Sequence, residues 1–135
     1  MSREFITGIW LAKFDNSAQL RQYVDYDYLE DQDNPKCKFA DDIGLSHIDT
    51  DFLESVFFSS SSEIFNTLKK ISFFDKFEME VLKSLNSINY SDKNSIISIS
   101  GIKDSGLINI EMFDLTPIQN DKDNLLFVGL YKFED

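Results

Sequence analysis

The sequence predicts an α+β domain in which a four- to five-stranded, mostly antiparallel sheet is covered by helices on one face. Two nearly continuous apolar runs, Phe5–Phe14 and Leu125–Phe133, are rich in β-branched and aromatic residues, as is typical of buried strands. Between them, apolar residues recur first with helical spacing and later, at Ser95–Ile102, with the alternation of a strand. A chain of 135 residues fits one domain, so we expect residues 1–135 to fold as a single unit.

Two short helical segments are predicted after the first strand. Asp15 or Asn16 supplies the polar side chain that commonly caps a helix, which places a helix at Ser17–Asp25. The segment Phe39–Gly44 has the pattern of a single helical turn, and its final glycine is the residue that most often ends one.

Two more helices are predicted in the middle of the chain. Ser60 and Glu63 have the spacing of a capping box, which indicates a helix beginning near Ile64 rather than a serine-rich linker. The segment Phe74–Ile88 places its apolar residues on one stripe, which predicts a second helix. The segment Asp51–Phe58 is compatible with either a helix or a strand.

The last third of the sequence has the period of strands. Ser95–Ile102 and Leu107–Phe113 both alternate, and the glycine-containing residues 103–106 between them predict a β-hairpin. The final run, Leu125–Phe133, is apolar enough to predict a central strand beside the first strand of the chain.

Negative charge is concentrated in one segment, Asp25–Glu54. It holds ten carboxylates and only two lysines, so it carries −8 of the net charge of −11. Such a field attracts basic partners and repels nucleic acid and anionic lipid, so we expect neither nucleic-acid nor membrane binding. Tyr23, Tyr26 and Tyr28 alternate with Asp25 and Asp27, a pattern typical of protein-binding hot spots, and the alternative is that one or two of these rings close the core. The predicted partner-binding residues are Asp25, Tyr26, Asp27, Tyr28, Glu30, Asp31, Asp33, Asp42, Asp49, Asp51 and Glu54.

The cysteine content and the absence of long apolar runs in the sequence indicate the cellular compartment. The single cysteine, Cys37, suits a reducing environment, although Lys36 and Lys38 beside it could depress its pKa. No apolar run approaches the roughly 18 residues of a membrane span, and the first residues lack a signal-peptide pattern. We therefore expect a soluble, cytoplasmic protein.

Catalytic alternatives rest on the carboxylates around the only histidine. Asp41, Asp42, His47, Asp49 and Asp51 could bind a divalent metal or transfer protons. However, one histidine excludes a zinc site with several imidazoles, and the spacing matches no metal signature. We therefore predict no catalytic residues, no metal and no cofactor, while a metal-dependent enzyme or an acidic adaptor protein remain the alternative functions.

Three segments together resemble the immunity protein 22 family of bacterial polymorphic toxin systems: IWLAKF, SAQLRQYVDYDY and KFADDIGLSHIDTDFLESVF. The resemblance covers about the first 60 residues, and two positions depart from it, Ala12 in place of glycine and Ile48 in place of tyrosine. The positions that match the family pattern are Trp10, Phe14, Tyr23, Phe39, Asp42, Asp49, Asp51, Phe52 and Glu54.

The resemblance implies a small cytoplasmic protein that is encoded beside a toxin and inhibits it by direct binding. On that basis we expect Asp25–Glu54 to form much of the toxin-facing surface, with Tyr26 and Tyr28 as anchors. The expected partner is a basic toxin domain, for which a nuclease is one candidate class, and the protein itself is expected to be a monomer or a weak homodimer.

Overall fold

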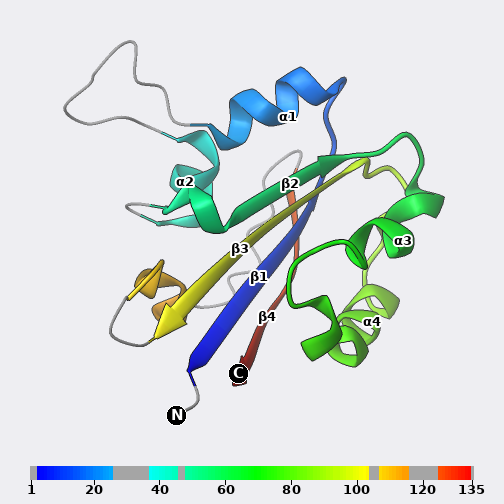
Figure 1. The fold of residues 1–135 in the computed structure, drawn as a ribbon. Helices are drawn as coiled ribbons and strands as arrows, with labels where there is room; N and C mark the ends of the chain where they lie inside the picture. Colours follow the sequence, from blue (N-terminus) through cyan, green and yellow to red (C-terminus); the bar gives the residue numbers. More distant parts are fainter. Residues whose placement is uncertain (1–2, 26–36, 46–47, 104–106, 116–124, 135) are drawn as a thin grey trace.

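The computed structural model describes residues 3–25, 37–45, 48–103, 107–115 and 125–134. In chain order the elements are β1 (Glu4–Ala12), α1 (Ser17–Val24), α2 (Lys38–Ile43), η1 (Thr50–Phe52), β2 (Leu53–Phe57), η2 (Ser61–Glu63), α3 (Ile64–Leu68), η3 (Phe74–Lys76), α4 (Glu78–Asn86), β3 (Ser95–Lys103), η4 (Ile110–Asp114) and β4 (Leu125–Glu134), where η denotes a 3₁₀ helix. The strands form one sheet in the order β2-β3-β1-β4 (Figure 1).

The predicted α+β class and the antiparallel sheet are confirmed, because all three strand pairs are antiparallel. The first and last strands are neighbours, as predicted, and Glu4 pairs with Glu134. The central place predicted for the last strand is wrong, because β4 lies at an edge and β1 lies between it and β3. Every residue of β1 from Phe5 to Ala12 is buried, whereas β4 is only partly so, and a bulge interrupts their pairing between Ile9 and Trp10.

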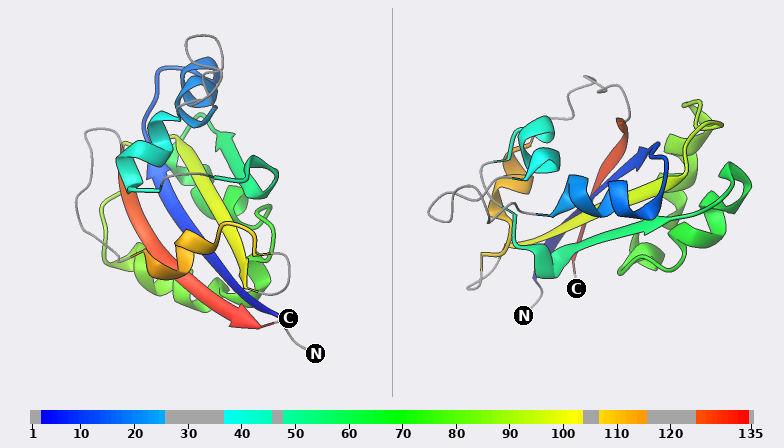
Figure 2. Two further views of the ribbon diagram at one scale, coloured as in Figure 1. Left: turned by 90° about the vertical axis from the view of Figure 1, so that its left-hand side faces the viewer. Right: turned by 90° about the horizontal axis from the view of Figure 1, so that it is seen from above.

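Helices cover both faces of the sheet, so the prediction of helices on one face is wrong. The physical reason is that the central strands are apolar on both sides and each side must be shielded from water. Ile6 and Trp10 of β1 lie in one core with α1, α2 and Met112 of η4, while Ile9 and Leu11 lie in a second core with α3 and α4. The left view of Figure 2 shows α2 and η4 in front of the sheet and α4 behind it.

The predicted hairpin is also wrong, because the segment after β3 forms only one bridge, Ile102 with Ile108, before it turns into η4. Leu107 and Asn109 have positive φ angles of 43° and 48°, which strand residues do not adopt. Burial favours this path, since the turn of η4 places Met112 fully inside the first core. The strands that pair with β3 are β1 and β2.

The remaining predicted elements agree with the structure with small changes. Asn16 caps α1, Gly44 ends α2 in the left-handed conformation, and Ser60 and Glu63 form the expected capping box ahead of α3. The predicted helix over 74–88 is split into η3 and α4 at Phe77, whose ring is buried. The ambiguous segment 51–58 is the end of η1 followed by strand β2.

Candidate partner-binding surface

The structure describes five of the predicted partner-binding residues, namely Asp25, Asp42, Asp49, Asp51 and Glu54. The other six, Tyr26, Asp27, Tyr28, Glu30, Asp31 and Asp33, lie outside the described residues, as does His47. Four of the five described carboxylates belong to the layer formed by α1, α2, η1 and η4, and Glu54 does not.

The aromatic residues that carry the family resemblance form one contiguous cluster in this layer. The Trp10 ring of β1 packs edge-on against Phe39 of α2, with ring centroids 5.2 Å apart. Tyr23 of α1 lies 5.7 Å from Phe39 and 5.3 Å from Phe14. These residues therefore join α1 and α2 to the sheet, and their role in the fold is to hold the layer in place.

Asp42 is fixed by a short hydrogen bond within the same layer. The Tyr23 hydroxyl donates to Asp42 Oδ2 at 2.6 Å, and Lys38 Nζ lies 3.9 Å from Asp42 Oδ1. Burial, and then the hydrogen bond to this carboxylate, raise the pKa of Tyr23 above its ordinary range. Only 18% of the Asp42 side chain is exposed, so this residue tethers α2 to α1 more than it faces solvent.

Asp49 is held by the side chain of Asn109, which is 60 residues away in the sequence. The Asp49 backbone N–H donates to Asn109 Oδ1 at 2.6 Å, and Asn109 Nδ2 donates to Asp49 O at 3.3 Å and to Ser100 O at 2.9 Å. The Asp49 carboxylate in turn accepts a bond from the Asp51 backbone N–H at 3.1 Å, which caps η1. These bonds join η1, β3 and the start of η4.

Glu54 faces the other side of the sheet. Its Oε1 accepts a hydrogen bond from the Ser72 backbone N–H at 3.0 Å, just beyond α3. Its neighbour Leu53 packs instead against the first core, as expected for alternating side chains of a strand. The structure therefore separates Glu54 from Asp25, Asp42 and Asp49.

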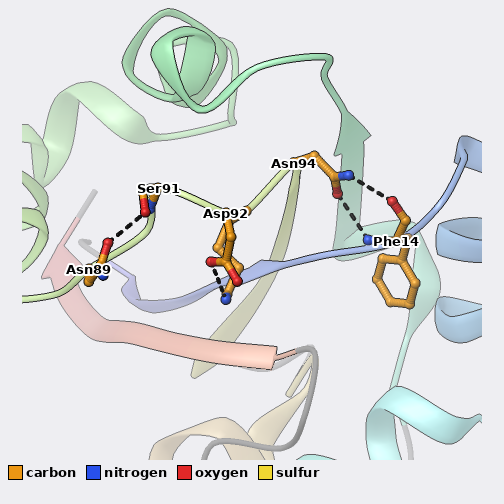
Figure 3. Close-up of polar contacts among 6 residues, drawn as sticks. Phe14, Asn89, Ser91, Asp92 and Asn94 are labelled. Carbon is orange, nitrogen blue, oxygen red and sulfur yellow. Dashed lines mark hydrogen bonds and ion pairs between the residues drawn. The ribbon is translucent and has the colours of Figure 1, made fainter.

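A second asparagine, Asn94, holds the end of β1 in the same way as Asn109 holds Asp49. Its Oδ1 accepts from the Phe14 backbone N–H at 3.0 Å, and its Nδ2 donates to Phe14 O at 2.7 Å (Figure 3). The backbone N–H of Asn94 donates to Ala12 O, and its backbone C=O accepts from the Phe58 N–H. Sequence reasoning missed both asparagines, because an isolated asparagine in a polar turn has no distinguishing pattern.

Charge is distributed unequally between the two helical layers. The described acidic layer, which we define as α1 with its C-cap, α2, η1 with its N-cap, and η4, carries seven carboxylates against Arg21 and Lys38, a net charge of −5. Those carboxylates are Asp25, Asp41, Asp42, Asp49, Asp51, Glu111 and Asp114. The opposite layer, residues 61–86, carries four carboxylates and four lysines and is neutral.

Two of these carboxylates, Glu111 and Asp114, were not among the predicted residues, because Glu111 lies in the segment expected to be a strand, Leu107–Phe113, and Asp114 directly follows it. The structure places them in η4, within the same layer as α2. Asp25, Asp41, Asp51 and Asp114 are exposed. A surface of this kind can attract and orient a basic protein.

Cys37 is a buried side chain of the first core, with 2% of its surface exposed. Its Sγ donates a weak hydrogen bond to Val24 O at 3.4 Å, and burial raises the pKa of the thiol, which is opposite to the shift its neighbouring lysines suggest. Among the described residues, no three His, Cys, Asp or Glu side chains gather as metal ligands would.

No helix in the described part of the chain is both long enough and apolar enough to cross a membrane.

Comparison with curated proteins and with solved structures finds no match to this chain. A protein-family model described as Immunity protein 22 matches residues 7–134, which includes the aromatic cluster, both asparagines and every strand from β2 to β4. On that match over nearly its whole length, the chain belongs to the immunity protein 22 family.

Proposed function

We propose that this protein binds a cognate bacterial toxin through its acidic layer and thereby neutralises it. Membership of the family supports an immunity role in general. The observation that carries the finer proposal is the charge difference between the layers, −5 for the acidic layer against zero for residues 61–86. Solubility alone would be served by charge spread over both faces, whereas a one-sided field orients an approaching partner.

The partner that suits this layer is a basic toxin domain. An immunity protein must capture its toxin quickly, and opposite charge raises association rates by roughly 10- to 1000-fold. A nuclease is the toxin class whose chemistry fits best, because a cleft that binds nucleic acid is lined with lysine and arginine. Residues 26–36, which include Tyr26, Tyr28, Asp27, Glu30, Asp31 and Asp33, are proposed to add further negative charge and aromatic area to this surface.

The described carboxylates divide into two groups by what they do. Asp42 and Asp49 hold the layer together through the bonds described above, so their removal would disturb the fold as well as the surface. Asp25, Asp41, Asp51 and Asp114 are exposed, and they are the described residues we assign to direct contact with the toxin.

We further propose that the protein acts in the cytoplasm as a monomer or at most a weak homodimer. The sheet edges support this assignment, because they are poorly suited to pairing with a second copy. The β2 edge has only five residues, while the β4 edge is bulged opposite Ile9 and Trp10 and bears the exposed Lys132.

The experiment that tests the proposal is co-expression with the C-terminal domain of the protein encoded immediately upstream. We expect that domain alone to stop growth, and its co-expression with this chain to restore growth and to yield a stable complex on purification. Toxicity that this chain does not relieve, or relief without a complex, would contradict direct neutralisation.

A further inference from the structure

Leu107 lies just before η4 of the acidic layer, and the fold does not explain why its side chain is exposed. Among the described residues, only Leu107 and Met79 are large hydrophobic side chains left substantially in solvent, with 57% and 66% of their surface exposed. Leu107 also has a φ of 43°, in the left-handed region, which costs a residue with a Cβ about 1–2 kcal/mol. Neither burial nor backbone preference therefore favours leucine at this position.

The backbone that follows Leu107, at Ile108 and Asn109, is held in place by hydrogen bonds. Ile102 and Ile108 exchange two backbone hydrogen bonds, of 2.8 and 3.1 Å. Asn109 is bonded to Asp49 and to β3 through its amide, as described above. Gly101 lets the two segments approach, since a Cβ at that position would lie 2.7 Å from Asn109 O. The backbone that presents this side chain is therefore fixed before binding, which lowers the entropic cost of association.

The neighbours of Leu107 in the chain have the composition of an interface centre. Ile108 and Ile110 are half-buried, and Glu111 and Asp114 follow within η4. Protein interfaces commonly combine an apolar centre, where most of the binding energy lies, with a charged rim that sets orientation. Met79 also has carboxylates beside it, Glu78 and Glu80, but it lies on α4 in a layer whose lysines balance its negative charge.

We propose that Leu107 is the apolar anchor of the toxin interface and inserts into an apolar pocket that is rimmed by basic residues. The inference rests on the proposed function and names the contact that would slow dissociation. A second copy of this chain is a poor occupant, because a symmetric contact through this face would bring two layers of net charge −5 together.

The test measures binding of purified variants to a catalytically inactivated C-terminal domain of the upstream-encoded protein. We expect Leu107→Ala to weaken the equilibrium affinity at least about tenfold, chiefly through faster dissociation. Leu107→Gly should weaken binding equally while leaving the thermal unfolding midpoint unchanged or higher, because glycine adopts positive φ without strain. Met79→Ala is the matched control and should bind as the wild-type chain does.

The outcomes separate this inference from the proposed function. If the wild-type chain binds and both Leu107 variants match it within a factor of about two, the anchor assignment is overturned and the immunity function stands. Equal losses for Leu107→Ala and Met79→Ala would also overturn it. Failure of the wild-type chain to bind would overturn the proposed function, and the anchor assignment with it.

Discussion

The side-chain amide of Asn109 binds the backbone N–H and C=O of Asp49 at the same time, although the two residues are 60 positions apart. Asn94 binds Phe14 by the same geometry across 80 positions. In both cases an amide side chain replaces the peptide group of a neighbouring strand and continues the hydrogen bonding beyond the end of the sheet. The fold thus uses two asparagines to fix η1 and the end of β1.

Replacing Asn109 with alanine should lower the free energy of unfolding by about 2–3 kcal/mol, because three part-buried backbone groups lose their partner. Asn109→Gly keeps the left-handed backbone available and should lose somewhat less. Urea denaturation followed by circular dichroism measures both. Equal stability of wild type and Asn109→Ala would contradict the assigned role.

Replacing Asn94 with alanine should cost about 2 kcal/mol, since Phe14 N–H and C=O both lose a bond. Asn94→Asp should also destabilise, because a carboxylate cannot donate to Phe14 O. The control is Asn89→Ala, which removes only an exposed 3.2 Å bond to the Ser91 backbone in the same loop (Figure 3). If Asn89→Ala lowers the free energy of unfolding as much as Asn94→Ala does, the loss comes from disturbing the loop and not from the two bonds of the Asn94 amide.

The Tyr23–Asp42 bond predicts a loss of stability at alkaline pH. Burial and the bond raise the folded-state pKa of Tyr23, whereas the unfolded chain ionises near pH 10. The stabilisation is therefore complete below about pH 10 and falls as pH rises toward the folded-state pKa, by at most about 1.4 kcal/mol per pH unit. Unfolding measured between pH 9 and about 11.5 should show this slope in the wild type.

Tyr23→Phe should remove that part of the slope and cost about 1–2 kcal/mol at neutral pH, because Asp42 loses its donor. The raised pKa of Tyr131, which is caused mainly by burial, leaves a residual alkaline slope in the variant. A slope identical in wild type and Tyr23→Phe would show that Tyr23 does not sense pH in the folded protein.

The elements that the sequence predicted well are those determined by local pattern. Apolar runs located β1 and β4, and the Ser60–Glu63 spacing located η2 and the start of α3. The errors arose where tertiary contacts, and not the local pattern, determine the secondary structure. The alternation at 107–113 predicts a strand. The segment instead forms η4, because Asn109 has a left-handed backbone and Met112 is buried.

Tertiary structure also explains why the predicted partner-binding residues do not all lie on one face of the sheet. Asp49, Asp51 and Glu54 are close in sequence, but β2 begins at Leu53 and alternation sends Glu54 to the opposite face. Conversely, Asp114 joins the acidic layer only through the path of η4. Strand order and the two-sided core therefore had to be known before the carboxylates could be assigned to one face.

The measurement that tests the central claim most directly is the association rate with the inactivated toxin domain as a function of salt concentration. One triple variant removes three exposed charges from the acidic layer, Asp41→Asn, Asp51→Asn and Asp114→Asn. Its control removes three charges from the neutral layer, the exposed Asp75→Asn and Glu80→Gln and the half-buried Glu78→Gln, so both proteins have the same net charge.

We predict that the acidic-layer variant associates about tenfold more slowly at low salt and with a flatter salt dependence. The control should stay within about a factor of two of the wild type, because its charges lie on the other side of the sheet. Equal slowing by both variants would show that only net charge matters. Unchanged rates for the acidic-layer variant would contradict docking through α1, α2, η1 and η4.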